Sequence, residues 1–96
     1  MRPPFHPLAA LLFATLAHSA AQAAEAQVAV AANFAEPIKA IAAVLEKTTG
    51  HTLKITLGST GKLYAQIRNG APFDLLLAAD AKTPEALEKE GLTLPG

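Results

Sequence analysis

The sequence lacks cysteine and tryptophan, and neither sign of charge is in excess. It contains eight Lys and Arg and eight Asp and Glu, so its formal net charge is zero. A chain without cysteine forms neither a disulfide framework nor a thiolate metal site. A neutral chain with few aromatic residues offers no basic stripe for nucleic acid. These absences exclude disulfide-stapled proteins, thiolate metal proteins and nucleic-acid-binding proteins.

Long apolar runs are also missing. The run LAALLFATLA, residues 8–17, is shorter than the roughly 20 residues that a membrane span requires. Arg2 precedes this run and small residues ending at Ala23 follow it, which predicts a secretory signal peptide over residues 1–23, cleaved after Ala23. An uncleaved anchor is the alternative, because Arg2, beside His6, is the only positive charge ahead of the run. We expect a soluble protein exported to a bacterial periplasm.

Residues 24–96 form a small mature chain with one histidine, His51. A single imidazole without a partner motif does not indicate a metal centre or a hydrolytic triad, so we expect His51 to lie in a surface turn. A chain of this size buries only about 60% of its unfolded surface, and this one has no stabilising cross-link. We therefore expect residues 24–96 to be the first part of a larger protein.

Strand and helix patterns alternate three times in the mature chain. Apolar patterns predict strands over residues 27–32, 52–57 and 73–80. Apolar residues at helical spacing predict a helix after each strand, ending near Gly50, Gly70 and Gly91, with Pro84 in the first turn of the last helix. Three such units with short connections predict an α/β fold: a parallel sheet flanked by helices in three layers.

The charge pattern of the strands predicts their order. Lys54 interrupts the apolar residues of the second strand, which indicates one wet face and a peripheral position. The first and third strands are uncharged within their apolar cores, which indicates central positions, and we expect the third, continuously apolar after Asp74, to be covered on both faces. The predicted order is 2-1-3. This order places a topological switch beside the first strand, where ligands bind in a crevice at the carboxyl ends of strands.

Polar residues follow the first two strands. Asn33 is a candidate N-cap with Glu36 in capping-box position, although Pro37 would shift the start of that helix by a residue or two. After the second strand comes GSTGK, in which Ser59 or Thr60 is the candidate N-cap. Two helix N-termini would then direct free N–H groups into one crevice, which favours an anion. The simpler interpretation is that all these residues are helix caps and nothing more.

The stretch GSTGK is not the phosphate loop of a nucleotide hydrolase. That loop requires Gly, four residues, Gly-Lys and then Ser or Thr. Thr56 stands where the first glycine is needed, and Leu63 stands where the magnesium-binding hydroxyl is needed. We expect Lys62, one turn inside its helix, to be solvated and not to bind phosphate.

Three further polar residues have structural interpretations. We expect Tyr64 to pack against neighbouring side chains. Asp74 and Asp80 flank the third strand and lie too far apart for concerted acid–base chemistry, so we expect them in turn and helix-cap roles. A periplasmic hydrolase lobe that uses one of these carboxylates is the alternative.

Three stretches in order and at close spacing carry a family resemblance: VAVAANFAEPIKAIAAVLEKTTG, GSTGKLYAQIRNGAPFDLLLAAD and PEALEKEG. Their most specific parts are AANF, GSTGKLYAQI and NGAPFDLLLAAD. Together they resemble the amino-terminal part of the periplasmic molybdate-binding proteins of ABC transporters. The resemblance implies a type II periplasmic binding protein with two α/β lobes and a hinge, in which residues 24–96 would be an incomplete first lobe.

The resemblance also implies a ligand site of neutral donors. It places anion ligands at Asn33, where many members have Ser, and at Thr60, where Ser is more usual. Ser59 and Ala32 are their neighbours in the same loops, and the backbone amides of Asn33 and Thr60 are expected co-ligands. Molybdenum would be held as its oxyanion, without direct coordination by protein atoms. A tyrosine expected from the second lobe is absent, and Tyr64 does not match its position.

The implied function is the capture of molybdate or tungstate in the periplasm, without a cofactor and without catalysis. A monomer would deliver the anion to an inner-membrane ABC permease. Sulfate-binding or phosphate-binding proteins of the same architecture are alternatives, although a phosphate site should include an acceptor and neither loop holds a carboxylate. A secreted protein that only contacts other proteins would show no response to anions.

Overall fold

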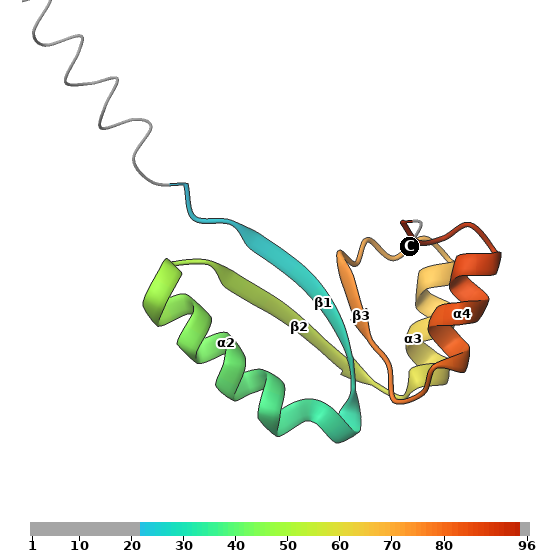
Figure 1. Cartoon of the computed structure of the whole chain (residues 1–96), viewed down its shortest axis with the longest axis horizontal. Helices are drawn as coiled ribbons and strands as arrows, with labels where there is room; N and C mark the ends of the chain where they lie inside the picture. Colours follow the sequence, from blue (N-terminus) through green and yellow to red (C-terminus); the bar gives the residue numbers. More distant parts are fainter. Residues whose placement is uncertain (1–21, 95–96) are drawn as a thin grey trace, which may run out of the picture.

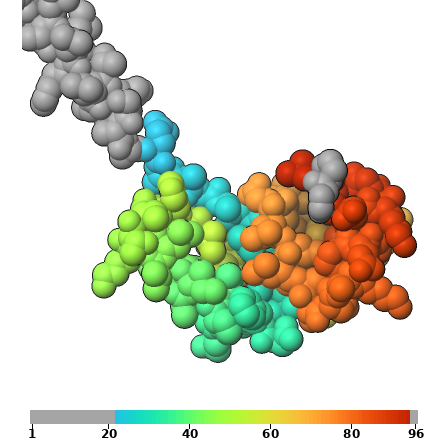
Figure 2. Space-filling view, viewed as in Figure 1, coloured from blue at the N-terminus to red at the C-terminus, as the bar shows by residue number. Residues whose placement is uncertain are grey.

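A computed structural model describes residues 22–94, and its strands, helices and connections are shown in Figure 1. The predicted signal peptide, residues 1–23, lies almost wholly outside this range and stays a prediction. In the described part, no helix is both long enough and apolar enough to cross a membrane. Figure 2 shows α2 (Ala35–Thr49) and α4 (Lys82–Lys89) on opposite sides of one folded body.

The sheet has three parallel strands in the predicted order. β1 (Glu25–Ala31) lies between β2 (Thr52–Gly58) and β3 (Leu75–Leu77), which confirms the 2-1-3 arrangement. β1 pairs with β2 along its whole length and with β3 over three residues. A strand with neighbours on both sides is suited to the small and β-branched residues that fill β1.

The helices lie on both faces of this sheet, as predicted. α2 follows a short 3-10 turn, η1 (Ala32–Phe34), and lies on one side of the strands, whereas α3 (Thr60–Arg68) and α4 lie on the other (Figure 1). The crossover from β1 to β2 and the crossover from β2 to β3 run in opposite directions across the sheet. Because both are right-handed, α2 and α3 lie on opposite faces. Gly50 and Gly91, with φ of 77° and 73°, end α2 and α4 in the left-handed conformation that glycine adopts without strain.

The core is built on the two faces of β1. Val28 and Val30 are 1% and 0% exposed and pack with Ile38 of α2. Successive side chains of a strand point to opposite faces, so Ala29 and Ala31 turn toward α3. Both alanines are buried, as is Leu63 of α3. Small residues on this face let α3 approach the sheet closely. This packing fixes the position of α3, and with it the positions of its first residue, Thr60, and its N-cap, Ser59.

The third strand is less covered than its sequence predicts. Leu75 is 52% exposed, and only three residues of the apolar stretch join the ladder, so the expectation of cover on both faces is wrong for the described chain. Within residues 22–94, β3 pairs with β1 on one side and with no strand on the other, so it is an edge strand of this sheet. Leu57 of β2, the other edge strand, is likewise 40% exposed.

Asp74 holds β1 and β3 together where the ladder begins. Its backbone N–H donates to the Gln27 carbonyl and its carboxylate Oδ2 accepts from the Gln27 N–H, both at 2.7 Å. The side chain therefore takes the place of a strand carbonyl. This contact confirms a structural role for Asp74.

Replacing Asp74 by alanine should lower the free energy of unfolding by about 1 kcal/mol, because a hydrogen bond from the Gln27 amide to a charged but exposed acceptor is lost. Asp74→Asn keeps an oxygen acceptor in the same place and should lose less than half as much. Urea unfolding followed by circular dichroism measures both. Equal losses in the two variants would assign the effect to the charge and not to the hydrogen bond.

Candidate functional site

The three strands end at the same edge of the sheet. Ala31 pairs with Gly58, and Val30 pairs with Leu77, so the chain leaves β1, β2 and β3 at neighbouring points. The segments that follow are residues 32–34, 59–61 and 78–80. The structure therefore brings the two predicted ligand loops, around Asn33 and Thr60, to adjacent positions on one edge.

Ser59 and Thr60 begin α3 and have different partners. Ser59 is the N-cap, and its Oγ accepts from the Lys62 backbone N–H at 3.2 Å, which confirms the predicted cap. Thr60 is the first residue of α3, and its Oγ1 accepts from the Ala79 backbone N–H at 3.1 Å. In both contacts the hydroxyl oxygen accepts, so the hydroxyl proton stays available for a further acceptor.

Asn33 is not the N-cap of α2, so this part of the prediction is wrong, whereas the expected shift of the helix start because of Pro37 is confirmed. It lies with Ala32 in η1, both are exposed, and the N-cap of α2 is Phe34, without a side-chain cap bond. With Asn33 as N-cap, Pro37 would stand where the first intrahelical N–H is needed. A start at Ala35 places Pro37 within the first turn, where that N–H has no helical partner.

Because Asn33 is not the N-cap, the predicted capping box between Asn33 and Glu36 is also wrong. Glu36 instead lies 3.7 Å from the Lys39 ammonium, one turn along α2. The Asn33 side chain is thus exposed at the end of β1 and is not used to start the helix. An amide in this position keeps its two N–H donors for a ligand.

Two cations of α3 lie at different distances from this edge. Lys62, in the first turn of α3, is exposed and lines an open depression with Thr56 and Gln66. Arg68 lies at the other end of α3, where its Nε is 3.1 Å from a Glu90 carboxylate oxygen. The loops after β1 and β2 themselves offer neutral donors: hydroxyl, amide and backbone N–H groups.

Tyr64 joins α3 to the end of α4, in agreement with its predicted packing role. Its hydroxyl donates to Glu90, and the Arg68 guanidinium lies 5.7 Å from the centre of its ring. The hydrogen bond to Glu90, followed by desolvation and the Glu90 charge, raises the pKa of Tyr64 above its ordinary value, while Arg68 lowers it. This cluster fixes the packing of α4 on α3 and lies apart from the strand ends.

The remaining polar candidates have separate structural partners. Asp80 Oδ1 accepts from the Thr83 N–H at 2.9 Å and so caps the start of α4, as predicted. His51, between α2 and β2, accepts through Nδ1 from the Ala24 N–H at 3.0 Å. Within residues 22–94 no group of three or more acidic, His or Cys side chains is placed to hold a metal ion.

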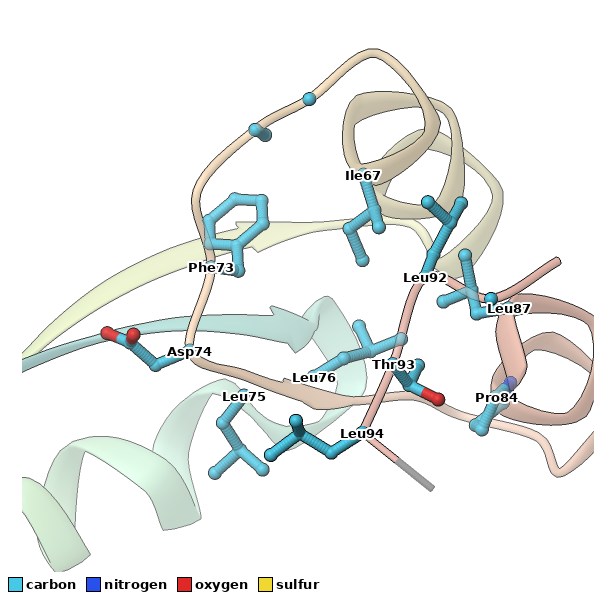
Figure 3. A pocket seen from close by; sticks show the side chains of 13 residues that line it. Ile67, Phe73, Asp74, Leu75, Leu76, Pro84, Leu87, Leu92, Thr93 and Leu94 are labelled. Carbon is cyan, nitrogen blue, oxygen red and sulfur yellow. The ribbon is translucent and has the colours of Figure 1, made fainter. Parts of the chain in front are cut away.

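An apolar hollow of about 720 Å³ lies beside the start of β3, away from the strand ends. Figure 3 shows Ile67, Leu76 and Leu92 gathered in it, with the Asp74 carboxylate to one side. An apolar lining and the negative charge of the Asp74 carboxylate disfavour the binding of an anion. The full lining is Ile67, Gly70, Ala71, Phe73, Asp74, Leu75, Leu76, Pro84, Leu87, Gly91, Leu92, Thr93 and Leu94.

Comparison with known proteins places the chain in a family. Residues 26–96 match the model of bacterial extracellular solute-binding proteins. The molybdate-binding protein ModA of Azotobacter vinelandii is 58% identical over 89 residues, which are 93% of this chain and 35% of that protein. The ModA of Rhodobacter capsulatus is 47% identical over 76 residues, which are 79% of this chain and 30% of that protein.

A solved structure shares the fold. The periplasmic molybdate-binding protein of Azotobacter vinelandii superimposes with a TM-score of 0.72 and 44% identity, over 74% of this chain and 31% of that one. The chain thus spans about a third of the length of the curated relatives, at 35% and 30%. These matches confirm the resemblance to periplasmic molybdate-binding proteins. The chain belongs to the family of bacterial extracellular solute-binding proteins.

Proposed function

We propose that this chain forms part of a periplasmic protein that binds molybdate or tungstate and delivers it to an ABC permease in the inner membrane. The observation that carries the proposal is the meeting of two loops of neutral donors, around Asn33 and Thr60, at one edge of the sheet. The proposed ligands are Ala32, Asn33, Ser59 and Thr60, with backbone amides of Asn33 and Thr60. The relatives named for molybdate binding support the same ligand class.

Neutral donors are sufficient to hold a small dianion. Each hydrogen bond to a charged acceptor contributes about 1.5–3 kcal/mol, and the positive end of the α3 dipole contributes about 0.3–1 kcal/mol more. Because such donors stabilise an anion only at the correct distance and angle, they select by shape and size more than by charge. A site of this kind needs no lysine or arginine, which agrees with the exposure of the Lys62 side chain.

Phosphate is the less favoured ligand. At neutral pH phosphate carries a proton, which requires an acceptor in the site, and no carboxylate lies in the loops that follow β1 and β2. The Ser59 and Thr60 oxygens already accept from backbone N–H groups. Sulfate carries no proton under these conditions, so its rejection depends on its smaller size.

We further propose that the protein binds and does not catalyse. Asp74 and Asp80, the two carboxylates that flank β3, are engaged with Gln27 and Thr83 respectively. In this proposal the mature chain begins after residue 23, acts as a monomer in the periplasm and binds the oxyanion without a cofactor.

Calorimetry and thermal unfolding of the complete gene product with molybdate, tungstate, sulfate and phosphate test the proposed function. Stabilisation by the first two anions alone is the expected result, since a ligand at 100 times its dissociation constant adds about 2.7 kcal/mol. Equal stabilisation by sulfate would change the assigned substrate. A protein that responds to none of the four anions, or that turns over a phosphate ester, would contradict the proposal.

A further inference from the structure

The start of β1 and the connection between α2 and β2 lie at the same end of the sheet (Figure 1). The Ala24 backbone nitrogen donates to His51 Nδ1 at 3.0 Å, across 27 positions of the chain. The Ala24 carbonyl accepts from the Thr52 N–H at 3.0 Å, next to the first pair of the ladder, Glu25 with Thr52. Ala24 is therefore held by its nitrogen and by its oxygen just before the strand begins.

The His51 backbone is fixed by the end of α2. The His51 N–H donates to Thr49 Oγ1 at 3.1 Å, and the Thr49 hydroxyl donates to the Leu45 carbonyl at 2.6 Å. Gly50, with φ of 77°, turns the chain between the helix and β2. The imidazole, half-buried beside the exposed Ala24, thus has a defined place from which its Nδ1 lone pair meets the Ala24 nitrogen.

Ala24 is also the proposed first residue of the mature chain. A signal peptidase would hydrolyse the Ala23–Ala24 peptide bond with one water molecule, leaving a carboxylate on Ala23 and an amine on Ala24 that takes up a proton. The ordinary pKa of an α-amino group is about 7.7–8.0, so this amine is mostly an ammonium at pH 7. The nitrogen that contacts His51 would change from a neutral peptide N–H to a cation with three protons.

We propose that His51 is a binding site for the α-amino group of the mature chain, so that processing after Ala23 strengthens the attachment of β1 to β2. The inference rests on the part of the proposed function that starts the mature chain at residue 24. A charged donor makes a shorter hydrogen bond, roughly twice as strong as a neutral one. The carboxyl end of α2, two residues before His51, also favours a positive charge nearby.

The contact is specific for one first residue. In a chain that began at Ala23, the Ala24 nitrogen would remain a neutral peptide N–H, and the amine would lie about one residue, or 3.8 Å, farther along the chain. In a chain that began at Glu25, the nitrogen that donates to His51 would be missing. The charge reaches His51 Nδ1 in the observed geometry only when cleavage follows Ala23.

The experiment uses the mature form of the complete gene product, with its first residue read by mass spectrometry. Acetylation of the α-amino group removes the charge and leaves one N–H, as in the unprocessed chain. At pH 7 and constant ionic strength, acetylation should speed hydrogen exchange of the Thr52 amide, which bonds to Ala24, about three- to fivefold. Exchange of the Val30 amide, in the buried middle of β1, is the internal control and should not change.

Two substitutions assign the effect to the imidazole. His51→Phe keeps an aromatic ring without a nitrogen acceptor, and in this variant acetylation should change exchange of the Thr52 amide by less than about 1.5-fold. His51→Asn offers an amide oxygen in place of Nδ1 and should restore an effect of about threefold. Nitrogen NMR of the wild type gives a reading that needs no variant: a neutral ring that accepts at Nδ1 carries its proton on Nε2.

The same effect of acetylation in the wild type and in His51→Phe would overturn the inference, as would a neutral His51 ring protonated on Nδ1. If His51→Phe does not fold, His51→Asn and the NMR signal decide. A mature protein that begins at another residue also overturns the inference, whether or not it binds molybdate. A protein that begins at Ala24 and binds none of the four anions overturns the proposed ligand and leaves the His51 contact to be judged by exchange.

Discussion

Leu63→Ala should lower the free energy of unfolding by about 2–5 kcal/mol, the range found when a fully buried leucine is truncated. Leu63 is 0% exposed, and its Cδ2 lies 3.4 Å from the place that a Cβ on Gly58 would occupy. The side chain therefore fills the space that the small residues at the ends of β1 and β2 leave open. A small domain has about 5–15 kcal/mol of stability in total, so the loss is a large part of it.

Leu94→Ala is the matched control, because it makes the same chemical change at a residue that is 89% exposed. It should alter the free energy of unfolding by less than about 0.5 kcal/mol. Urea unfolding at constant ionic strength gives both values. If Leu63→Ala and Leu94→Ala lose the same amount, the packing of α3 on the sheet does not stabilise the fold in the way described.

Asn33→Ala and Thr60→Val should each weaken molybdate binding about 10- to 100-fold in the complete gene product. Each variant removes a hydrogen-bond donor to a charged acceptor, for which about 1.5–3 kcal/mol is expected. Thr60→Val keeps the shape of the side chain and removes only the hydroxyl. Asn33 caps no helix, so its truncation should leave the free energy of unfolding nearly unchanged. Calorimetry measures the affinity and urea unfolding the stability of each variant.

Lys62→Ala is the control for both variants. Its side chain is exposed and lines a depression that includes neither Asn33 nor Thr60, so molybdate affinity should stay within about twofold of the wild type. A larger loss in Lys62→Ala than in Thr60→Val would show that a cation and not a hydroxyl holds the anion. Full retention of affinity in both Asn33→Ala and Thr60→Val would remove the assigned site.

The sheet topology could be predicted because it follows from local patterns. Lys54 marks a strand with one wet face, and the first strand, uncharged within its apolar core, is the one with two neighbours. The helix ends at Gly50 and Gly91 and the cap at Ser59 depend on residues close in sequence, and the structure confirms them. Predictions of this kind succeed because the physical cause lies within a few residues of the effect.

The wrong or missing predictions concern features that depend on residues distant in sequence, or on neighbouring residues with competing preferences. The predicted cap at Asn33 is wrong because Asn33 and Pro37 favour different first residues of α2, and the helix starts at Ala35, after a 3-10 turn, as Pro37 requires. The exposure of Leu75 depends on what covers β3, which its own sequence does not specify. The contacts of Thr60 with Ala79 and of Tyr64 with Glu90 join residues 19 and 26 positions apart, and no local sequence pattern predicts such contacts.

The paired contact of Asp74 with Gln27 has a consequence for how β3 is aligned along β1. A shift of β3 by one residue would separate the carboxylate from the Gln27 amide and turn each leucine to the opposite face. Only one alignment satisfies both hydrogen bonds, so Asp74 fixes the register of β3 on β1. The same alignment sets the point at which β3 ends. It therefore places the Ala79 amide within hydrogen-bond distance of Thr60 Oγ1 at the other end of the strand.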